Sequence, residues 1–276
     1  MPGRRHRPAG PSLRNCPLTL LYISLANLIS GVASVLAAAL LSYRLQNRLI
    51  PLMVSFSVGM LLGNAVLNLL PEAFASAPYG GRRVAWVLLG GFVAFFLLEK
   101  ALLLRHSHHH EGDGHAHHHG HDRKEAGPGG LLILVGDAFH NFADGVLVAA
   151  AFIADPALGW TTALAIAVHE VPQEVGDFIV LINAGLTRRR ALVYNLVSGL
   201  SAIAGGLLGW LMLRQSEALV PSVIALAASG FIYIALADLV PDMHRQRAAR
   251  TSAGQVALLA LGIAVAAAAG AVAHSH

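Results

Sequence analysis

The sequence predicts an all-α polytopic membrane protein with eight transmembrane helices. The 276-residue chain is 55% hydrophobic and only 12% charged, which is about half the charge of an ordinary soluble domain. Apolar stretches of about 20 residues, the length that crosses a bilayer, recur along the whole chain. Most Lys and Arg residues fall between these stretches. A soluble globular fold is therefore excluded.

The apolar runs follow one another with polar links between them. The first run is too long to be the apolar part of a signal peptide, so we interpret it as a span. The Arg- and Pro-rich segment before it is expected to be disordered. The predicted spans are 18–41, 49–71, 84–104, 130–153, 158–184, 191–213, 219–241 and 254–273. They group into a tail (1–17), spans 1–3 (18–104), a His-rich link (105–128), spans 4–8 (129–273) and a C-terminal tail (274–276).

Small residues in two of the spans predict close helix packing. The second span has Gly59 and Gly63 four residues apart, so that both lie on one helix face. The sixth span contains Gly205 and Gly206 among other small residues. Such residues let the backbones of membrane helices approach each other.

A short internal similarity links the second and seventh spans. Asn68-Leu-Leu-Pro-Glu72 resembles Asp238-Leu-Val-Pro-Asp242, and the two spans cross in opposite directions. This predicts an inverted repeat of spans 1–3 and 6–8 around a central pair formed by spans 4 and 5. Polar residues of the repeated spans are then expected along a pathway: Asn64, Asn68 and Glu72 toward the outside, and Asp238, Asp242 and His244 toward the inside.

The distribution of positive charge predicts the orientation in the membrane. Twelve Lys and Arg lie at the links after spans 1, 3, 5 and 7, counting Lys100, against three at the links after spans 2, 4 and 6. The positive-inside rule then places the odd links in the cytoplasm and both termini outside, although the N-terminal tail carries four Arg. We expect an integral protein of the plasma (inner) membrane.

The link at 105–128 is rich in histidine. Its Gly and charged residues exclude a packed core, and tracts of this composition bind transition metals loosely. We expect it to face the cytoplasm and to bind metal without forming the central site. Its histidines are His106, His108, His109, His110, His115, His117, His118, His119 and His121.

Ionisable side chains gather inside spans 4 and 5. The fourth span carries three on one helix face, at i, i+3 and i+7: Asp137, His140 and Asp144. The fifth carries two neighbouring stripes: His169 with Gln173, and Glu170 with Glu174 and Asp177. Each charged residue costs roughly 2.5–3.5 kcal/mol at the bilayer centre, so hydrogen bonding between helices alone is the weaker explanation. Converging imidazole nitrogens and carboxylate oxygens predict a site for a borderline divalent cation.

Pro172 lies inside the fifth-span cluster. Proline has no backbone N–H, so the carbonyl of Val168 loses its helical donor and the helix is expected to kink. A kink beside the cluster can open the helix and expose a carbonyl oxygen.

These residues resemble the motifs of the ZIP (Zrt/Irt-like) family of divalent metal transporters. His140-Asn-Phe-Ala-Asp-Gly145 is similar to the family's fourth-span motif. His169-Glu-Val-Pro-Gln-Glu174 is similar to the fifth-span motif of the subfamily with a His-Glu-x-Pro-His-Glu signature. The resemblance covers nearly all of residues 18–273 and implies uptake of zinc or a related metal into the cytoplasm. The metal ligands that it implies are His140, Asn141, Asp144, His169, Glu170, Gln173 and Glu174.

Two positions depart from the family pattern. Gln173 stands where the subfamily often has His, and Ala202 stands near the place where some prokaryotic members have a Glu for a second metal.

The expected substrate is Zn²⁺, with Fe²⁺, Mn²⁺ and Cd²⁺ as further candidates, and no organic cofactor is expected. The expected partners are the metal ion and the lipid bilayer, without nucleic acid, and the sequence is compatible with a homodimer.

Three other functions fit parts of the sequence. An intramembrane zinc protease needs His-Glu-x-x-His, but position 173 is Gln and Pro172 disrupts the helix, so we expect no enzyme. A proton-driven metal exporter usually has six spans and a folded cytoplasmic tail. A metal sensor would bind without transport, whereas an inverted repeat favours alternating access.

Overall fold

The computed structural model describes residues 17–44, 50–78, 80–107, 126–183, 185–244 and 249–274. The described residues are helical apart from short turns, and they contain no strand. The N-terminal tail predicted to be disordered lies outside them, except for residue 17. The structure does not describe the side chains of the nine histidines in the His-rich link. The same holds for the side chains of Asp238, Asp242 and His244.

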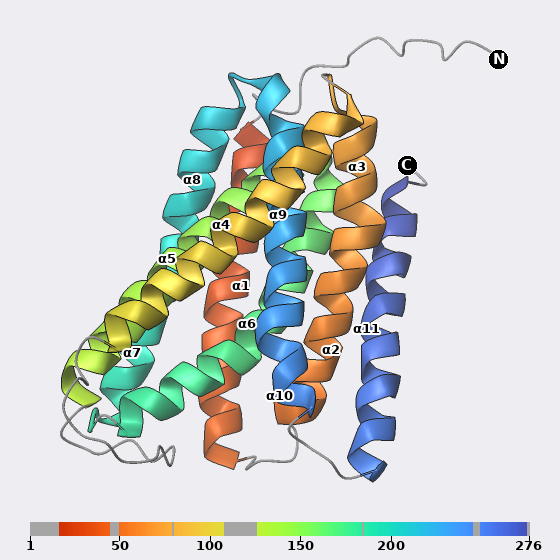
Figure 1. The fold of residues 1–276 in the computed structure, drawn as a ribbon. Helices are drawn as coiled ribbons and strands as arrows, with labels where there is room; N and C mark the ends of the chain where they lie inside the picture. The colour runs from red at the N-terminus through yellow and green to blue at the C-terminus, as the bar shows by residue number, and fades with distance from the viewer. Residues whose placement is uncertain are drawn as a thin grey trace.

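Eight helical columns run alternately up and down the bundle (Figure 1). Five are single helices: α1 Pro17–Arg44, α4 Gly81–Ser107, α5 Ala126–Ala154, α6 Pro156–Asn183 and α11 Ala249–His274. Three are composite: α2 Ile50–Gly63, η2 Asn64–Leu69 and α3 Leu70–Ala75; α7 Arg188–Gly199 and α8 Ser201–Leu213; and α9 Val220–Tyr233, η4 Ile234–Leu239 and α10 Val240–His244, after a short turn η3 Glu217–Leu219. They correspond to the eight predicted spans, although α4 and α5 extend a few residues into the predicted 105–128 link.

The outer surface of the bundle is apolar. Seven described helical stretches are long and apolar enough to cross a membrane. The remaining column, α6, is not among these seven stretches. It carries the polar cluster predicted for the fifth span. Large apolar side chains are exposed around the bundle, including Trp86 at 67%, Val135 at 61% and Val256 at 67%. So much exposed apolar surface is a liability in water and is expected where a protein faces lipid.

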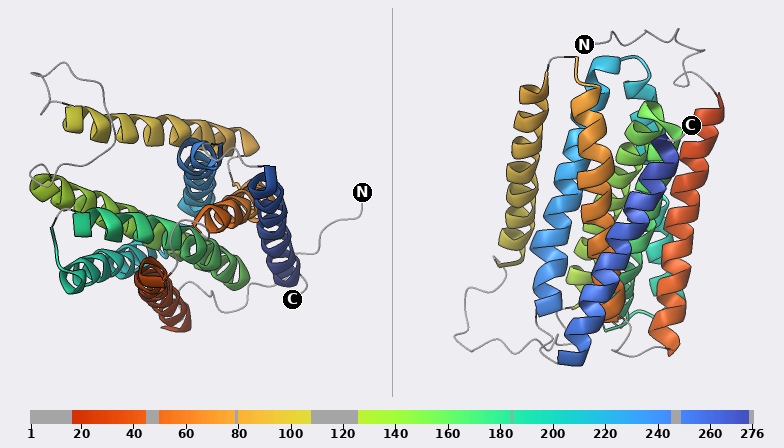
Figure 2. Two further views of the ribbon diagram at one scale, coloured as in Figure 1. Left: turned by 90° about the horizontal axis from the view of Figure 1, so that it is seen from below. Right: turned by 90° about the vertical axis from the view of Figure 1, so that its right-hand side faces the viewer.

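The central pair of the bundle is α5 and α6. They contact each other, α5 also packs against α1, α7, α8 and α9, and α6 packs against α1, α2, α7 and α11. At the edge, α4 packs chiefly against α9 (Figure 2). The side chains that α5 and α6 turn toward each other are therefore enclosed by the remaining helices.

Glycines bring two pairs of helices into close contact, as the sequence predicted. Where α5 crosses α8, a Cβ atom on Gly145 would collide with the backbone carbonyl of Ala202, and one on Gly205 with that of Phe142. Where α2 crosses α11, a Cβ atom on Gly59 would collide with the carbonyl of Leu259. The backbones of these helices touch because no side chain separates them.

The internal repeat extends beyond sequence. Both repeated segments begin inside a π-helical turn in the same register: η2 ends just before Leu70-Pro71, and η4 ends just before Val240-Pro241. Each turn closes with an N–H bonded five residues back, from Leu70 to Ala65 and from Val240 to Ala235. The composite columns pack against each other in opposite directions, since α3 and η2 contact α9 while α10 and η4 contact α2. Widened turns of this kind accommodate proline in membrane helices.

Candidate metal site

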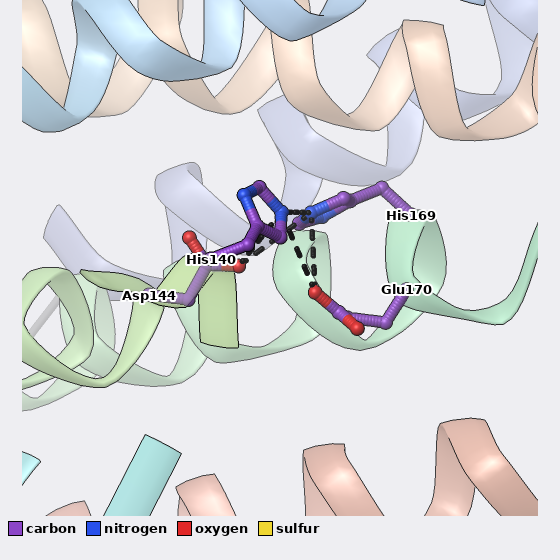
Figure 3. A group of neighbouring side chains, drawn as sticks. All are labelled: His140, Asp144, His169 and Glu170. Atoms are coloured by element: carbon purple, nitrogen blue, oxygen red, sulfur yellow. Dashed lines mark hydrogen bonds and ion pairs between the residues drawn. The ribbon is translucent and has the colours of Figure 1, made fainter. Parts of the chain in front are cut away.

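Four side chains of α5 and α6 point at one another inside the bundle (Figure 3). His140 and Asp144 come from successive turns of α5, and His169 and Glu170 are consecutive in α6. Asp144, His169 and Glu170 are at most 3% exposed, and His140 is partly buried. We call these four residues the first site.

The four candidate ligand atoms of the first site form a compact tetrahedron. The two Nε2 atoms of His140 and His169 are 3.3 Å apart. Oδ2 of Asp144 lies 3.6 Å from the first nitrogen and 3.5 Å from the second. Oε1 of Glu170 lies 3.6 Å from each nitrogen.

These spacings match those of zinc ligands. Zinc binds imidazole nitrogen and carboxylate oxygen at ~2.0–2.1 Å in tetrahedral geometry, which separates the ligands from one another by roughly 3.3–3.4 Å. Five of the six distances in the first site lie between 3.3 and 3.6 Å. The two carboxylates together offset the charge of a divalent ion, and the two imidazoles bind it as neutral ligands.

A backbone contact orients His169 for this role. Its Nδ1 atom is 3.2 Å from the carbonyl oxygen of Ala165, one turn back in α6. A carbonyl only accepts hydrogen bonds, so Nδ1 carries the proton and Nε2 presents its lone pair to the first site. Hydrogen bonds from the second ring nitrogen are the usual support of a metal-binding histidine.

The oxygens that face the imidazoles have no hydrogen-bond donor. Among the described residues, Oδ2 of Asp144 and both carboxylate oxygens of Glu170 are buried without a hydrogen-bond partner. Buried polar atoms are normally satisfied, and exceptions require an explanation such as an ion. A group of acceptor atoms without donors fits a cation.

The other predicted ligands lie beside the first site. Asn141 and Gln173 each donate a hydrogen bond of 3.1 Å to Oδ1 of Asp137. Glu174 is fully buried and lies near Asp137 and Glu170, whose carboxylate oxygens come within 4.8 Å of one another and of its own. Asp177, one turn further along α6, is only partly buried.

A residue that sequence reasoning missed stabilises α6 at Pro172. The helix is continuous from Pro156 to Asn183. The carbonyl of Val168, which Pro172 leaves without a donor, lies 3.0 Å from the hydroxyl oxygen of Ser57 in α2. The same hydroxyl is 2.9 Å from the carbonyl of Met53, so its single proton is shared between two acceptors. Nothing in the sequence links Ser57 to Val168, because the two residues are 111 positions apart.

The predicted outer pathway residues lie toward the turn between α5 and α6. Asn64 donates to Thr162 in α6 (3.3 Å), and Asn68 donates to Asn64 (3.0 Å) and to the carbonyl of Ala266 in α11 (3.1 Å). These amides therefore join three helices. A cavity of about 140 Å³ opens at this end, and its lining includes Asn68, Glu72, Asp155 and Thr161.

Comparison with known proteins identifies relatives of this chain. The family model described as ZIP zinc transporter matches residues 18–128 and 104–270. The chain is 34% identical over 232 residues to zinc transporter ZIP13 of Pongo abelii, covering 77% of this chain and 64% of that protein. It is 33% identical over 289 residues to zinc transporter ZIP4 of Rattus norvegicus, covering 82% and 44%. It is 40% identical over 152 residues to zinc transporter ZIP10 of Mus musculus, covering 52% and 18%.

The matched relatives are longer than this chain, which spans from under a fifth to under two thirds of their lengths. The family model, in contrast, covers almost the whole helical bundle, including both helices of the first site. With the fold, the paired motifs and this coverage together, the chain belongs to the ZIP zinc transporter family.

Proposed function

We propose that this protein carries a divalent transition metal, zinc above all, across a membrane into the cytoplasm through the first site. The observation that carries the proposal is the tetrahedron of two imidazole nitrogens and two carboxylate oxygens, buried between two helices of a membrane bundle. The names of the relatives, all zinc transporters, agree with this substrate.

The ligand chemistry suits an ion that has to leave again. Imidazole and carboxylate bind Zn²⁺ well and also accept Fe²⁺, Mn²⁺ and Cd²⁺, whereas a thiolate cluster would hold the ion more tightly. The only cysteine of the chain, Cys16, precedes the first span. Conduction requires binding that is favourable enough for entry and weak enough for exit.

Two amides act as supports in this proposal. Asn141 and Gln173 are ligands by family resemblance, but their amide nitrogens are engaged with Asp137. We assign them the role of orienting the carboxylate, and we assign the first-site role to His140, Asp144, His169 and Glu170. Hydrogen-bonded partners of this kind tune and orient the ligands of metal sites.

The orientation follows from the charge bias of the links. The ion enters from the end with the cavity, past Asn68 and Glu72, and leaves toward the end where the His-rich link joins α4 and α5. Asp238, Asp242 and His244 serve the inner side. Cysteines introduced at 68 and 238 should be labelled by impermeant reagents from opposite sides, and labelling of both from one side contradicts this orientation.

Metal flux tests the function itself. Purified protein is reconstituted into liposomes that contain a zinc-sensitive dye, and zinc is added outside. Saturable uptake beyond that of empty liposomes supports transport, and tight binding without flux would identify a sensor instead. A variant that lacks residues 106–121 should keep most of the flux, because the His-rich link is not on the proposed path. Complete loss of flux in a well-expressed deletion would place the link on the path.

A further inference from the structure

Three consecutive arginines form the first turn of α7. Arg188, Arg189 and Arg190 lie at the end of the bundle where α5 begins and α6 ends (Figure 1). All three are exposed, and the turn contains no acidic residue. Among the described residues, neither Arg189 nor Arg190 forms an ion pair through its side chain. We call Arg188, Arg189 and Arg190 the arginine turn.

The stability of α7 does not explain the arginine turn. The first turn of a helix carries a positive partial charge and favours acidic side chains there, so three cations at this place are unfavourable for the helix itself. The helix begins with a neutral cap instead, since the hydroxyl oxygen of Thr187 accepts a hydrogen bond of 3.4 Å from the N–H of Arg190. Residues that contradict a local preference often serve a function.

An exposed apolar face continues from the arginine turn along α7. Residues four apart share one face of a helix, which places Val193 below Arg189 and Tyr194 below Arg190. Val193, Tyr194 and Val197 are 47%, 45% and 63% exposed. One outward face of α7 therefore presents guanidinium groups first, then a phenol, then aliphatic side chains. A phospholipid has the same order of polarity, from phosphate through glycerol to acyl chain.

Helix α5 widens this apolar face. The hydroxyl of Ser198 donates to the carbonyl of Leu134 at 3.4 Å, so α5 and α7 pack together at this depth. The neighbouring residues Val135 and Val197 are 61% and 63% exposed. Phe139, one turn further along α5, is 58% exposed. The apolar surface below the arginine turn therefore extends over two helices, as binding of acyl chains requires.

The opposite face of α7 contacts the helix that carries half of the first site. Asn195 is 1% exposed and donates to the backbone carbonyl of Glu174 in α6 at 3.4 Å. Ala191 is fully buried in a cluster with Phe178 and Leu181 of the same helix. A ligand that holds the outer face of α7 therefore also steadies α6.

We propose that the arginine turn and the apolar face below it bind an anionic phospholipid of the surrounding membrane. Guanidinium groups bind phosphate oxygens through paired N–H groups, and basic residues at a membrane surface attract anionic lipids. The acyl chains lie along Val193, Tyr194 and Val197. A soluble acidic protein would match the charge but not the apolar face, which belongs to the membrane-spanning stretch Arg188–Leu213. This binding does not rest on the proposed metal transport.

Titration calorimetry of short-chain phosphatidylglycerol into the purified full-length protein in an uncharged detergent tests the proposal. The wild type should bind this lipid more tightly than it binds short-chain phosphatidylcholine. The double variant Arg189→Gln with Arg190→Gln should weaken the binding by about tenfold or more. The matched control is Arg82→Gln with Arg83→Gln, which removes two exposed arginines from the start of α4, at the other end of the bundle. Equal losses in both double variants would show that only net charge matters and overturn the proposal.

Two further measurements distinguish the lipid from other ligands. Glycerol phosphate has the headgroup chemistry without acyl chains; if the wild type binds it as tightly as phosphatidylglycerol, the apolar face is not used and the lipid assignment fails. In nanodiscs, phosphatidylglycerol should raise the melting temperature of the wild type by about 2–4 °C over phosphatidylcholine, and the Arg189 and Arg190 double variant should lose this difference. If that variant changes the oligomeric state and leaves phosphatidylglycerol affinity unchanged, the face binds a second copy of the chain and the proposal is overturned.

Discussion

Nε2 of His140 lies 3.3 Å from Nε2 of His169, although the two residues belong to different helices. The contact to Ala165 leaves a lone pair on Nε2 of His169, so in the neutral protein this nitrogen needs either a proton on its neighbour or a shared cation. Two carboxylate oxygens lie within 3.6 Å of the same nitrogens. The arrangement is costly without an ion and favourable with one, and several consequences can be measured.

Neutralising the carboxylate of Asp144 should stabilise the metal-free protein and weaken metal binding. Asp144 is buried, and its Oδ2 has no hydrogen-bond partner among the described residues. We therefore expect Asp144→Asn to raise the melting temperature of the metal-free protein by about 2–4 °C, which corresponds to roughly 1 kcal/mol for a chain of this class. The same variant should lose the additional stabilisation that zinc gives to the wild type. Scanning fluorimetry with and without zinc measures both, and an unchanged zinc-induced shift contradicts the assignment of Asp144.

The hydroxyl of Ser57 should matter because of Pro172. Ser57→Ala leaves the carbonyl of Val168 without a donor, and we expect a loss of about 1 kcal/mol in the free energy of unfolding. In a Pro172→Ala background the helix regains an N–H for that carbonyl, so the cost of Ser57→Ala should shrink. Ser30→Ala is the control, because the buried hydroxyl of Ser30 has no partner among the described residues. Equal costs of Ser57→Ala in both backgrounds would rule out this coupling.

Close packing of α5 on α8 should be sensitive to one methyl group. A Cβ atom on Gly205 would meet the carbonyl of Phe142, so Gly205→Ala must separate the two helices and should cost about 1–3 kcal/mol. Gly136, which like Phe142 belongs to α5, is the comparison: a Cβ atom on it would meet nothing within 4 Å. Gly136→Ala should therefore be neutral or stabilising by about 0.5–1 kcal/mol. Thermal unfolding in detergent compares the two, and equal melting temperatures would contradict the packing described here.

Acid should weaken zinc binding. Zinc binds neutral imidazole and ionised carboxylate, so protons compete with the metal for every ligand of the first site. We expect the apparent zinc affinity, measured by titration calorimetry, to fall by about tenfold or more between about pH 7 and about pH 5, the range in which histidine usually changes its charge. The variant lacking 106–121 is the appropriate background because it removes the histidines of the link. Affinity that does not change with pH would argue against imidazole ligands.

Much of this architecture follows from sequence patterns. The eight spans follow from the lengths of the apolar runs, and close packing of the second and sixth spans follows from glycines such as Gly59 and Gly205. The partners of these spans, α11 and α5, come from the structure alone. The inverted repeat follows from a five-residue similarity, but the π-turns η2 and η4, in which both copies begin, do not. A π-turn forms where a helix turn accommodates one extra residue, and no residue type marks that position.

The four residues that make up the first site could not be picked out from sequence alone. Helical spacing shows which residues share a stripe on one helix, and it grouped His169 with Gln173 and Glu170 with Glu174. It does not give the rotation and shift of α6 against α5. Those two quantities put the consecutive residues His169 and Glu170 together in the first site, and they turn Gln173 toward Asp137 instead. The contact of Ser57 with Val168 depends on the same relative placement of helices.

Zinc flux through single variants of the first site tests the central claim most directly. His140→Ala and Asp144→Ala are each reconstituted into liposomes at wild-type amounts, and initial rates of uptake are measured over a range of zinc concentrations. The control is Val256→Ala, because Val256 is exposed on the outer surface of α11, away from the first site and the cavity. We predict that both first-site variants lose saturable uptake while the control keeps it. If His140→Ala and Asp144→Ala both transport zinc with unchanged apparent affinity, the four side chains are structural and the ion passes elsewhere.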